Sequence, residues 1–356
     1  MKDSSGSLAR AVRHGANPLL TPNGAVASSP GLKIDGVLNC GVTRFKDEIL
    51  LLCRVAESAP SDGSVARIPL IQKDSGSTVI VSLVKSDHPE YCFEDPRVVT
   101  RRGAKSPAVE YLTSLSHLRI ARSHDGVSFK LDDKPAVWPV PPYEAFGMED
   151  PRITNIDGCY YINYTASSPA GCATALMKTT DFVSFERLGL IFLPENKDVC
   201  IFPQKINGKY YALNRPVPNA IGSPDMWISE SPDLVHWGRH QHIHSASNGR
   251  VGGGAVPFLT ERGWVAIYHW ADASDRYCLG AMLLDANDPS EVIAISTTPL
   301  LEPVELYETQ GYFSNVVFTC GCLYENGIVT IYYGAADDKI CRADVAIEDV
   351  YALLDA

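Results

Sequence analysis

The chain has 356 residues, of which 45% are hydrophobic and 21% are charged, a composition typical of globular proteins with a large core. Its formal net charge of −11 argues against nucleic-acid binding, which needs a basic face, but leaves room for a small anion pocket built from a few arginines. No apolar run reaches the roughly 18 residues of a membrane span, and the opening segment lacks the charged-then-apolar layout of a secretory signal. We therefore expect a cytoplasmic protein with neither a nucleic-acid nor a membrane partner.

The ten cysteines are spread through apolar segments, and the closest pair, Cys320 and Cys322, has no second pair at zinc-ligand spacing. This pattern is typical of buried free thiols in a reducing compartment. No H-E-x-x-H motif is present, so we expect no metal site.

Taken in chain order, the predicted elements are mostly strands. Residues 1–16 are expected to form an N-terminal extension, of which the first 12 or so look helical. Short runs rich in Val, Ile, Tyr and Phe then alternate with Gly, Pro, Asp and Asn, for example at 48–55, 159–166, 209–216, 263–270 and 327–336. The final segment, 343–356, is predicted to be a helix.

A repeated pattern runs in register with these strands. "SHDGVSF" at 123–129, "TTDFVSF" at 179–185 and "SPDLVHW" at 231–237 each combine a polar pair, an Asp, a β-branched residue and an aromatic residue. Their aspartates, Asp125, Asp181 and Asp233, are about 50 to 56 residues apart, within the range for a four-stranded propeller blade. We expect the Asp to cap a tight turn and the aromatic ring to pack between sheets. The pattern predicts an all-β propeller of five or six blades in a single domain, 1–356, with a pair of β-sandwiches as the alternative.

The tetrapeptide Glu-Asp-Pro-Arg occurs twice, at 94–97 and 149–152. In the second copy, Pro151 bars Asp150 from an α conformation and favours a rigid loop or strand entry. Asp150 is then either a general acid or part of a corner brace in which Arg152 pairs with Glu149. The residues alone leave these two interpretations equally open, and the duplication favours the brace for at least one copy.

Polar residues interrupt several of the predicted inner strands, where a purely structural strand would avoid them. The cationic ones come from different repeat units and together resemble an anion pocket, since guanidinium groups match tetrahedral oxyanions well. The candidates are Asn39, Arg54, Lys205, Arg215, Arg250, His269 and Asp337. The glycine-rich "RVGGGAV" at 250–256 is a weak candidate for a phosphate loop, because no Walker pattern and no helix accompany it.

These segments together resemble glycoside hydrolase family 130, the β-mannoside phosphorylases and β-1,2-mannosidases. The resemblance runs from "NPLLTP" at 17 to "YYGAADD" at 338 and includes, in order, "VLNCGV", "LLCRVAE", "YEAFGMEDPRIT", "NKDVCIFPQKINGKYYALNRP", "RVGGGAVP" and "IYHW". It implies a five-bladed β-propeller with short helical terminal extensions. It also implies an inverting enzyme whose nucleophile is phosphate in the phosphorylases and water in the hydrolases.

The resemblance also implies roles for individual residues. Asp150, rather than Asp95, is the expected catalytic acid, and in the phosphorylases its proton would pass through the 3-hydroxyl of the mannose. The sugar-binding positions are expected to be Asn39, Arg54 and Asp337, joined by Asp95 and Arg152. Phosphate is expected to be held by Arg215, Arg250, His269 and Lys205. Inorganic phosphate would be the co-substrate, and no metal or organic cofactor is implied.

The preferred function is therefore an inverting phosphorylase that cleaves short β-mannosides with phosphate to give α-mannose 1-phosphate. An inverting β-mannosidase that uses water is the alternative, and a non-catalytic carbohydrate-binding propeller is a third. Two departures from the family pattern bear on the choice, because "NRP" at 214–216 replaces "HRP" and Arg250 stands where lysine is expected. The basic set is otherwise retained, which favours phosphorolysis. Linkage, acceptor sugar and oligomeric state are left open, with a homo-oligomer as one option.

Overall fold

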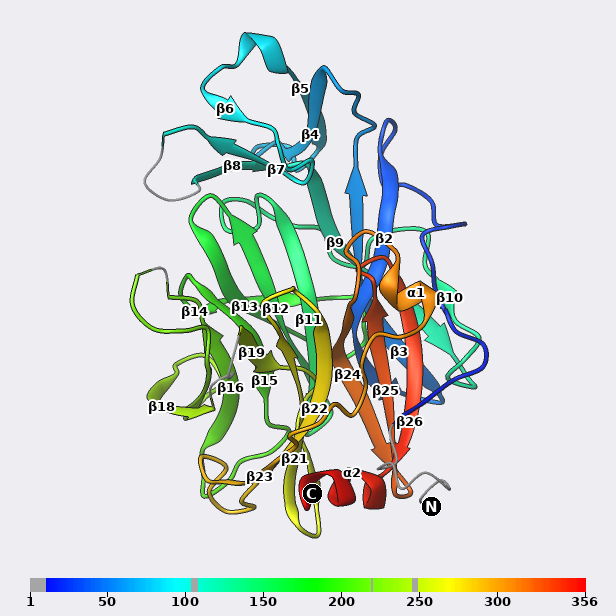
Figure 1. Cartoon of the computed structure of the whole chain (residues 1–356), viewed down its shortest axis with the longest axis vertical. Coiled ribbons are helices and arrows are strands. Elements are labelled where there is room, and N and C mark those ends of the chain that lie inside the picture. The colour runs from blue at the N-terminus through cyan, green and yellow to red at the C-terminus, as the bar shows by residue number, and fades with distance from the viewer. Residues whose placement is uncertain (1–10, 104–107, 219, 245–248) are drawn as a thin grey trace.

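The computed structural model describes residues 11–103, 108–218, 220–244 and 249–356. The described chain is almost entirely β-strand, as predicted, with only a 3₁₀ turn and two short helices. In Figure 1 the strands form a large body of twisted sheets, with a smaller group of strands at the top and the C-terminal helix at the bottom. No helix in the described ranges is long and apolar enough to cross a membrane.

The largest sheet contains two successive four-stranded units. The first unit consists of β2 (Lys33–Phe45), β3 (Glu48–Ser58), β9 (Ser114–Ser123) and β10 (Lys130–Leu131). The second consists of β11 (Gly147–Ile156), β12 (Cys159–Ser168), β13 (Gly171–Thr179) and β14 (Glu186–Phe192). A single parallel pairing, Gly147 with Ser116, joins the two units.

Three further sheets follow along the chain. One contains β15 (Asn196–Ile201), β16 (Tyr210–Pro216), β17 (Met226–Ser231) and β18 (Gly238–His244). The next contains β19 (Arg250–Gly253), β21 (Gly263–Ala271), β22 (Tyr277–Leu284) and β23 (Val292–Ile295), with β20 (Phe258–Thr260) beside β21. The last contains β24 (Val317–Glu325), β25 (Ile328–Ala335) and β26 (Lys339–Ala346), and α1 (Leu306–Thr309) precedes it. The first strands of the five units lie side by side, with β11 between β2 and β15, β15 against β19, and β2 against β24.

An insertion, residues 59–113, separates β3 from β9 and forms the small group of strands at the top of Figure 1. Its elements are β4 (Val65–Ile71), β5 (Thr78–Val84), η1 (Lys85–Asp87), β6 (Tyr91–Cys92), β7 (Val98–Arg101) and β8 (Ala108–Leu112). They form two small sheets around a hydrophobic cluster of their own that is centred on Ile68, Leu83 and Val99. The insertion therefore has a local core and does not extend the main sheets.

The repeated aspartates cap turns as the sequence predicts. Asp125 Oδ1 accepts the backbone N–H groups of Val127 and Ser128 at 2.8 and 2.7 Å. Asp181 and Asp233 each accept the N–H groups two and three positions further along, at distances between 2.8 and 3.0 Å. Each turn follows the third strand of its unit, so the motif marks one structural position in three successive units.

The aromatic residue of the repeat packs between sheets in at least two of the three copies. Phe129, which lies between β9 and β10, meets Tyr332 of β25 edge to face, with ring centroids 5.7 Å apart. Trp237, which follows β17, stacks on Phe192 of β14, with centroids 5.6 Å apart. These contacts fill the space between neighbouring sheets with large apolar surfaces, which stabilises their packing.

The predicted C-terminal helix begins later than expected, and the predicted N-terminal helix falls mostly on residues outside the described ranges. Residues 343–346 complete β26, in which Ala343 and Val345 alternate with more exposed neighbours and pair with β25. The helix α2 spans only Ile347–Leu354, where burial changes to a helical period. At the other end, residues 1–10 lie outside the described ranges, and β1 (Val12–Arg13) is a strand that pairs with Asp344 and Ala343 of β26. The change from period-two burial to a helical period marks where β26 ends and α2 begins.

Candidate active site

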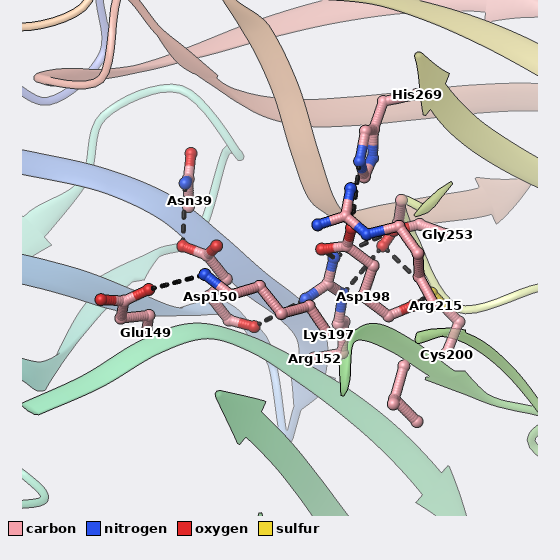
Figure 2. A network of polar contacts seen from close by, with 12 residues as sticks. Asn39, Glu149, Asp150, Arg152, Lys197, Asp198, Cys200, Arg215, Gly253 and His269 are labelled. Carbon is pink, nitrogen blue, oxygen red and sulfur yellow. Dashed lines mark hydrogen bonds and ion pairs between the residues drawn. The ribbon is translucent and has the colours of Figure 1, made fainter. Parts of the chain in front are cut away.

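A polar pocket of about 250 Å³ opens where the first strands of the units meet. Its walls come from all five units and from the insertion. The lining residues are Asn39, Arg54, Arg97, Glu149, Asp150, Lys197, Asp198, Arg215, Arg250, His269, Tyr277, Phe313, Val316, Phe318 and Asp337. Figure 2 shows the polar contacts among many of them, with Asn39, Asp150 and Glu149 on one side and Asp198, Arg215 and His269 on the other.

Three of these side chains lie at β-bulges and have positive φ angles. Asn39 in β2, Asp150 in β11 and Asp198 in β15 all adopt positive φ angles, of 44°, 51° and 55°. In each strand the pairing register slips at that residue, which defines a β-bulge. A bulge bends the strand and redirects one side chain, and Asn and Asp are the non-glycine residues that adopt the left-handed region most readily. The three inner strands therefore each turn one polar side chain toward the same pocket.

Asp150 is held by two donors from the first unit. Asn39 Nδ2 donates to Asp150 Oδ1 at 2.8 Å, and Arg54 Nη1 donates to the same oxygen at 3.2 Å. The other terminal nitrogen of Arg54 lies 3.4 Å from Glu149 Oε1. Because both hydrogen bonds go to Oδ1, Oδ2 is the carboxylate oxygen that a bound substrate would meet. Asp150 thus has the fixed orientation that a proton donor requires.

Asp337 lies on the same side of the pocket, in the turn between β25 and β26. Burial raises the pKa of Asp337 to about 6; Arg54 opposes this shift, and the carboxylates of Asp150 and Glu149 add to it. The protein therefore holds three carboxyl groups around one arginine, and Asp337 is the one whose charge is disfavoured.

Replacing Asp337 by Asn should remove a pH-dependent loss of stability. Because the folded-state pKa of Asp337 is raised, its contribution to stability is full below its ordinary value of 3.8 and is lost as the pH rises through about 6. We expect Asp337→Asn to match the wild type below pH 4 and to exceed it by up to about 3 kcal/mol at neutral pH. Urea unfolding of both proteins across this range measures the difference. A difference that does not vary with pH would contradict the assignment.

The opposite side of the pocket is a buried cluster of cations around one carboxylate. Asp198 Oδ2 lies 3.0 Å from Arg215 Nη1 and 3.2 Å from His269 Nε2, and Asp198 Oδ1 lies 3.4 Å from Arg152 Nη2. Burial would raise the pKa of Asp198, but Arg215, His269 and Arg152 outweigh it and hold this pKa well below its usual range. Burial lowers the pKa of His269, against the opposing charge of Asp198. The cluster therefore contains a charged carboxylate and two permanently charged guanidinium groups.

Two more cations flank this cluster. Lys197 Nζ lies 3.9 Å from Glu149 Oε2, between the carboxylates and the basic cluster. Arg250 Nε donates to the Tyr277 hydroxyl at 2.8 Å, and its Nη2 lies 2.8 Å from Asp275 Oδ1. With Arg215, these residues place three cationic side chains on the pocket wall, which is the arrangement that binds a tetrahedral anion.

The glycine-rich segment at 250–256 has a packing role. A Cβ on Gly252 would lie 2.3 Å from Asp198 Oδ2 and 2.9 Å from His269 Nε2. A Cβ on Gly253 would lie 2.7 Å from Cys200 Sγ. The glycines allow β19 to approach the buried ionic cluster closely, and this explains the motif without a phosphate loop.

Most predicted site residues come together in this pocket. The structure places seven of them in its lining, namely Asn39, Arg54, Asp150, Arg215, Arg250, His269 and Asp337. Arg152 lies beneath the pocket, 1% exposed, and donates to the backbone carbonyls of Asp150, Gly253 and Gly254 at 3.0 to 3.1 Å. It therefore braces the bulge and the ionic cluster from behind, and Glu149 pairs with Arg54 and Lys197 instead.

Lys205 is placed elsewhere. It is exposed in the connection after β15, and its ammonium lies 4.9 Å from the centre of the Tyr210 ring. Lys197, eight positions earlier, lines the pocket in its place. Lys197 and Asp198 both occur in "NKDVC", which belongs to the quoted family-like segment, but their approach to the pocket depends on the bulge in β15.

The two Glu-Asp-Pro-Arg copies occupy different structures. The second lies within β11, whereas the first forms a turn between β6 and β7 of the insertion. Asp95 is outside the pocket lining and forms a two-pronged ion pair with Arg97, with oxygen–nitrogen distances of 2.7 and 2.9 Å. Arg97 itself lines the pocket and lies over the Phe313 ring. The first copy is thus part of the pocket wall, and its contributing side chain is the arginine.

A fixed carboxyl group that faces a buried cation cluster across a polar pocket is typical of an enzyme active site. Residues 109–356 match the model of glycoside hydrolase family 130, which is described as β-1,4-mannooligosaccharide phosphorylase. The chain belongs to this family. The matched range begins at the end of the insertion, so most of the insertion and β2 and β3 lie outside it.

Individual relatives extend the similarity to the whole chain. The chain is 45% identical over 343 residues to a β-1,2-mannobiose phosphorylase of Listeria innocua, covering 95% of this chain and 96% of that protein. It is 40% identical over 252 residues to a 1,2-β-oligomannan phosphorylase of Thermoanaerobacter, covering 68% and 83% of the two chains. The solved structure of the Listeria innocua β-1,2-mannobiose phosphorylase in complex with β-1,2-mannobiose superposes with a TM-score of 0.92, over 97% of this chain and 99% of that one.

Proposed function

We propose that the protein is an inverting phosphorylase that cleaves β-1,2-linked mannobiose with inorganic phosphate to give α-mannose 1-phosphate and mannose. The observation that carries this proposal is the pocket itself, in which Asp150 faces Arg215, Arg250 and Lys197 across a space of about 250 Å³. The choice of β-1,2-mannobiose is supported by the relative from Listeria innocua, which is similar over almost the full length of both chains.

In the proposed reaction, Asp150 supplies a proton, by way of the 3-hydroxyl of the mannose, to the glycosidic oxygen. The bond between that oxygen and the anomeric carbon breaks, and a phosphate oxygen forms a bond to the same carbon from the opposite face. Asn39 and Arg54 orient Asp150 and remain to stabilise its carboxylate after the proton has left. Asp337, on the same wall, is available to bind the mannose hydroxyls.

The anion would be held by Arg215, Arg250, Lys197 and His269. Arg250 and Lys197 lie at the edges of the basic cluster, whereas Arg215 and His269 contact Asp198. Asp198 keeps the buried cations paired while the pocket is empty, and an arriving phosphate shares them. Positioning of the nucleophile and compensation of its charge would be the main contributions of this side of the pocket.

We further propose that the five units form a closed five-bladed propeller, in which β1 completes the last blade. The side-by-side order of β2, β11, β15, β19 and β24 and the turn motif repeated after the third strand of three successive units support this architecture. No disulfide joins the cysteines of the described residues, which supports a reducing compartment such as the cytoplasm.

The proposal is tested by assaying the purified protein on β-1,2- and β-1,4-mannobiose with and without phosphate. We expect turnover of the β-1,2 disaccharide only when phosphate is present, with α-mannose 1-phosphate as the product. Turnover that ignores phosphate would instead identify a β-mannosidase, for which Asp198 is the carboxylate placed to activate water. Binding without turnover under either condition would identify a carbohydrate-binding propeller.

A further inference from the structure

A second pocket, of about 440 Å³, lies between β14 and the sheet of β15 to β18. We call it the aromatic pocket. The residues that matter for its chemistry are Phe192, Asn196, Asn214, Trp227, Trp237 and His240. Its other lining residues are aliphatic or proline, so no charged side chain lines it. This sets the aromatic pocket apart from the active-site pocket, which is lined by cations and carboxylates.

The aromatic pocket and the active-site pocket share two strands. Lys197 and Arg215 pair with each other across β15 and β16, and both line the active-site pocket. Their neighbours Asn196 and Asn214 point to the opposite face of the sheet, because successive residues of a strand alternate between faces. Both neighbours line the aromatic pocket. A ligand bound in one pocket therefore contacts the same pair of strands as a ligand bound in the other.

The polar floor of the aromatic pocket is a chain of hydrogen bonds that ends in an unused acceptor. Asn196 Nδ2 donates to Asn214 Oδ1 at 3.1 Å, and Asn214 Nδ2 donates to Ser229 Oγ at 2.8 Å. Ser229 Oγ lies 2.7 Å from Nδ1 of His240, at the exposed rim. Asn196 is only 7% exposed, and its Oδ1 has no hydrogen-bond partner among the described residues. A buried amide oxygen without a partner is costly, so a small rotation of the Asn196 amide that brings this atom to a donor of a ligand would be favoured.

The walls of the aromatic pocket supply flat apolar surface. Trp237 stacks on Phe192, and Trp227 stands on the same face as Asn214, with which it pairs across β16 and β17. A neutral ligand that presents C–H faces to aromatic rings and hydroxyl groups to amides fits this combination. Sugars have this chemistry, whereas phosphate and other anions find no cation there.

We propose that the aromatic pocket is a second saccharide-binding site, which takes a neutral oligosaccharide. That this saccharide is a β-mannoside of the kind cleaved in the active-site pocket rests on the proposed function. Such a site would hold substrate on the protein surface next to the strands that carry Lys197 and Arg215, and would raise its local concentration.

The test uses the full-length Asp150→Asn variant, so that the saccharide is not consumed, with ¹⁵N-labelled tryptophan. The chain has five tryptophans, and substitution assigns the indole signals of Trp227 and Trp237. We expect both signals to shift on titration with β-1,2-mannobiose. The same shifts should occur in a protein that also carries Arg54→Ala, which weakens sugar binding in the active-site pocket. Trp227→Ala should weaken this binding about tenfold, the effect expected for losing one aromatic stacking partner.

Two further variants separate binding from damage to the fold. His240→Ala removes an exposed rim residue and should also weaken binding of the saccharide. It replaces Trp227→Ala as the test if that variant does not fold. Tyr324→Ala removes a partly buried ring stacked on Phe258, outside both pockets, and should leave binding unchanged. In an otherwise wild-type chain, Trp227→Ala should retain phosphorolysis of the disaccharide.

Indole signals that do not move, or that move only while the active-site pocket binds sugar, would overturn the proposal. An oligomer that dissociates on Trp227→Ala would also overturn it, because the aromatic pocket would then be a protein interface. Phosphorolysis by the wild type is measured separately, so failure of the second site and failure of the proposed reaction give different results.

Discussion

Asp150→Asn is expected to lower kcat for phosphorolysis of β-1,2-mannobiose by about 10³-fold, the scale of a lost general acid. The amide has nearly the same shape and keeps an oxygen for Asn39 and Arg54, so the pocket should stay folded and continue to bind sugar. Release of α-mannose 1-phosphate measures the effect, and circular dichroism checks that the fold is retained.

Asp95→Asn is the matched control, since it makes the same change in the other copy of the tetrapeptide. Asp95 contacts Arg97 and does not line the pocket, so its loss should loosen Arg97 and raise KM by less than about tenfold, the effect of an exposed ion pair. Comparable losses of kcat in both variants would contradict the assignment of Asp150 as the proton donor.

Asp198→Asn is expected to lower the free energy of unfolding by about 3–5 kcal/mol in phosphate-free buffer, the range for breaking a buried ion pair from one side. The change leaves Arg215 and Arg152 buried without their counter-charge. Added phosphate should restore part of this stability, because an anion in the pocket supplies the missing charge. Denaturant unfolding with and without phosphate gives both quantities.

Glu57→Gln provides the comparison. Glu57 lies 3.1 Å from Arg119 and 3.3 Å from His117, and all three side chains are fully buried outside the active-site pocket. This variant should also be destabilised, but phosphate should not rescue it, because the anion has no access to Arg119 through the active site. Equal rescue of both variants would show that phosphate acts nonspecifically and would remove support for the anion site.

The repeat was the most informative feature of the sequence for the fold. Asp125, Asp181 and Asp233 predict their turns because an aspartate that caps two backbone N–H groups is a local interaction, fully contained in seven residues. Asp285 forms the same turn, accepting the N–H groups of Asn287 and Asp288 at 2.8 and 2.9 Å, but its segment lacks the aromatic residue. A pattern defined by the aromatic ring therefore does not include this fourth turn.

The site was predictable in part. Charged residues within apolar strands identify Arg54, Arg215 and His269, because an ionisable side chain at such a position needs a partner or a pocket. Lys205 lies outside the pocket and Lys197 lines it, because a bulge that the sequence gives no sign of turns the start of β15 toward the pocket. Bulges depend on pairing with another strand, which is a non-local property.

The insertion explains why the two Glu-Asp-Pro-Arg copies differ. They are about 55 residues apart, close to the period of the repeat, yet the first lies in a separate small unit with its own core. Agreement in spacing arose because the inserted segment is about as long as one repeat. The identical tetrapeptides therefore share a sequence but neither a strand position nor a set of contacts.

Pairing of β1 with β26 joins residues from opposite ends of the chain, and Arg13 adds an ion pair with Glu308 at 2.7 Å. During synthesis, β1 must wait without its partner until β26 has left the ribosome. Contacts between segments so distant in sequence form late and slowly, because their loop-closure entropy must first be overcome. We therefore expect nascent chains that stop before residue 339 to leave the edge of β25 unpaired and prone to aggregation, and to depend on chaperones until the last strand arrives.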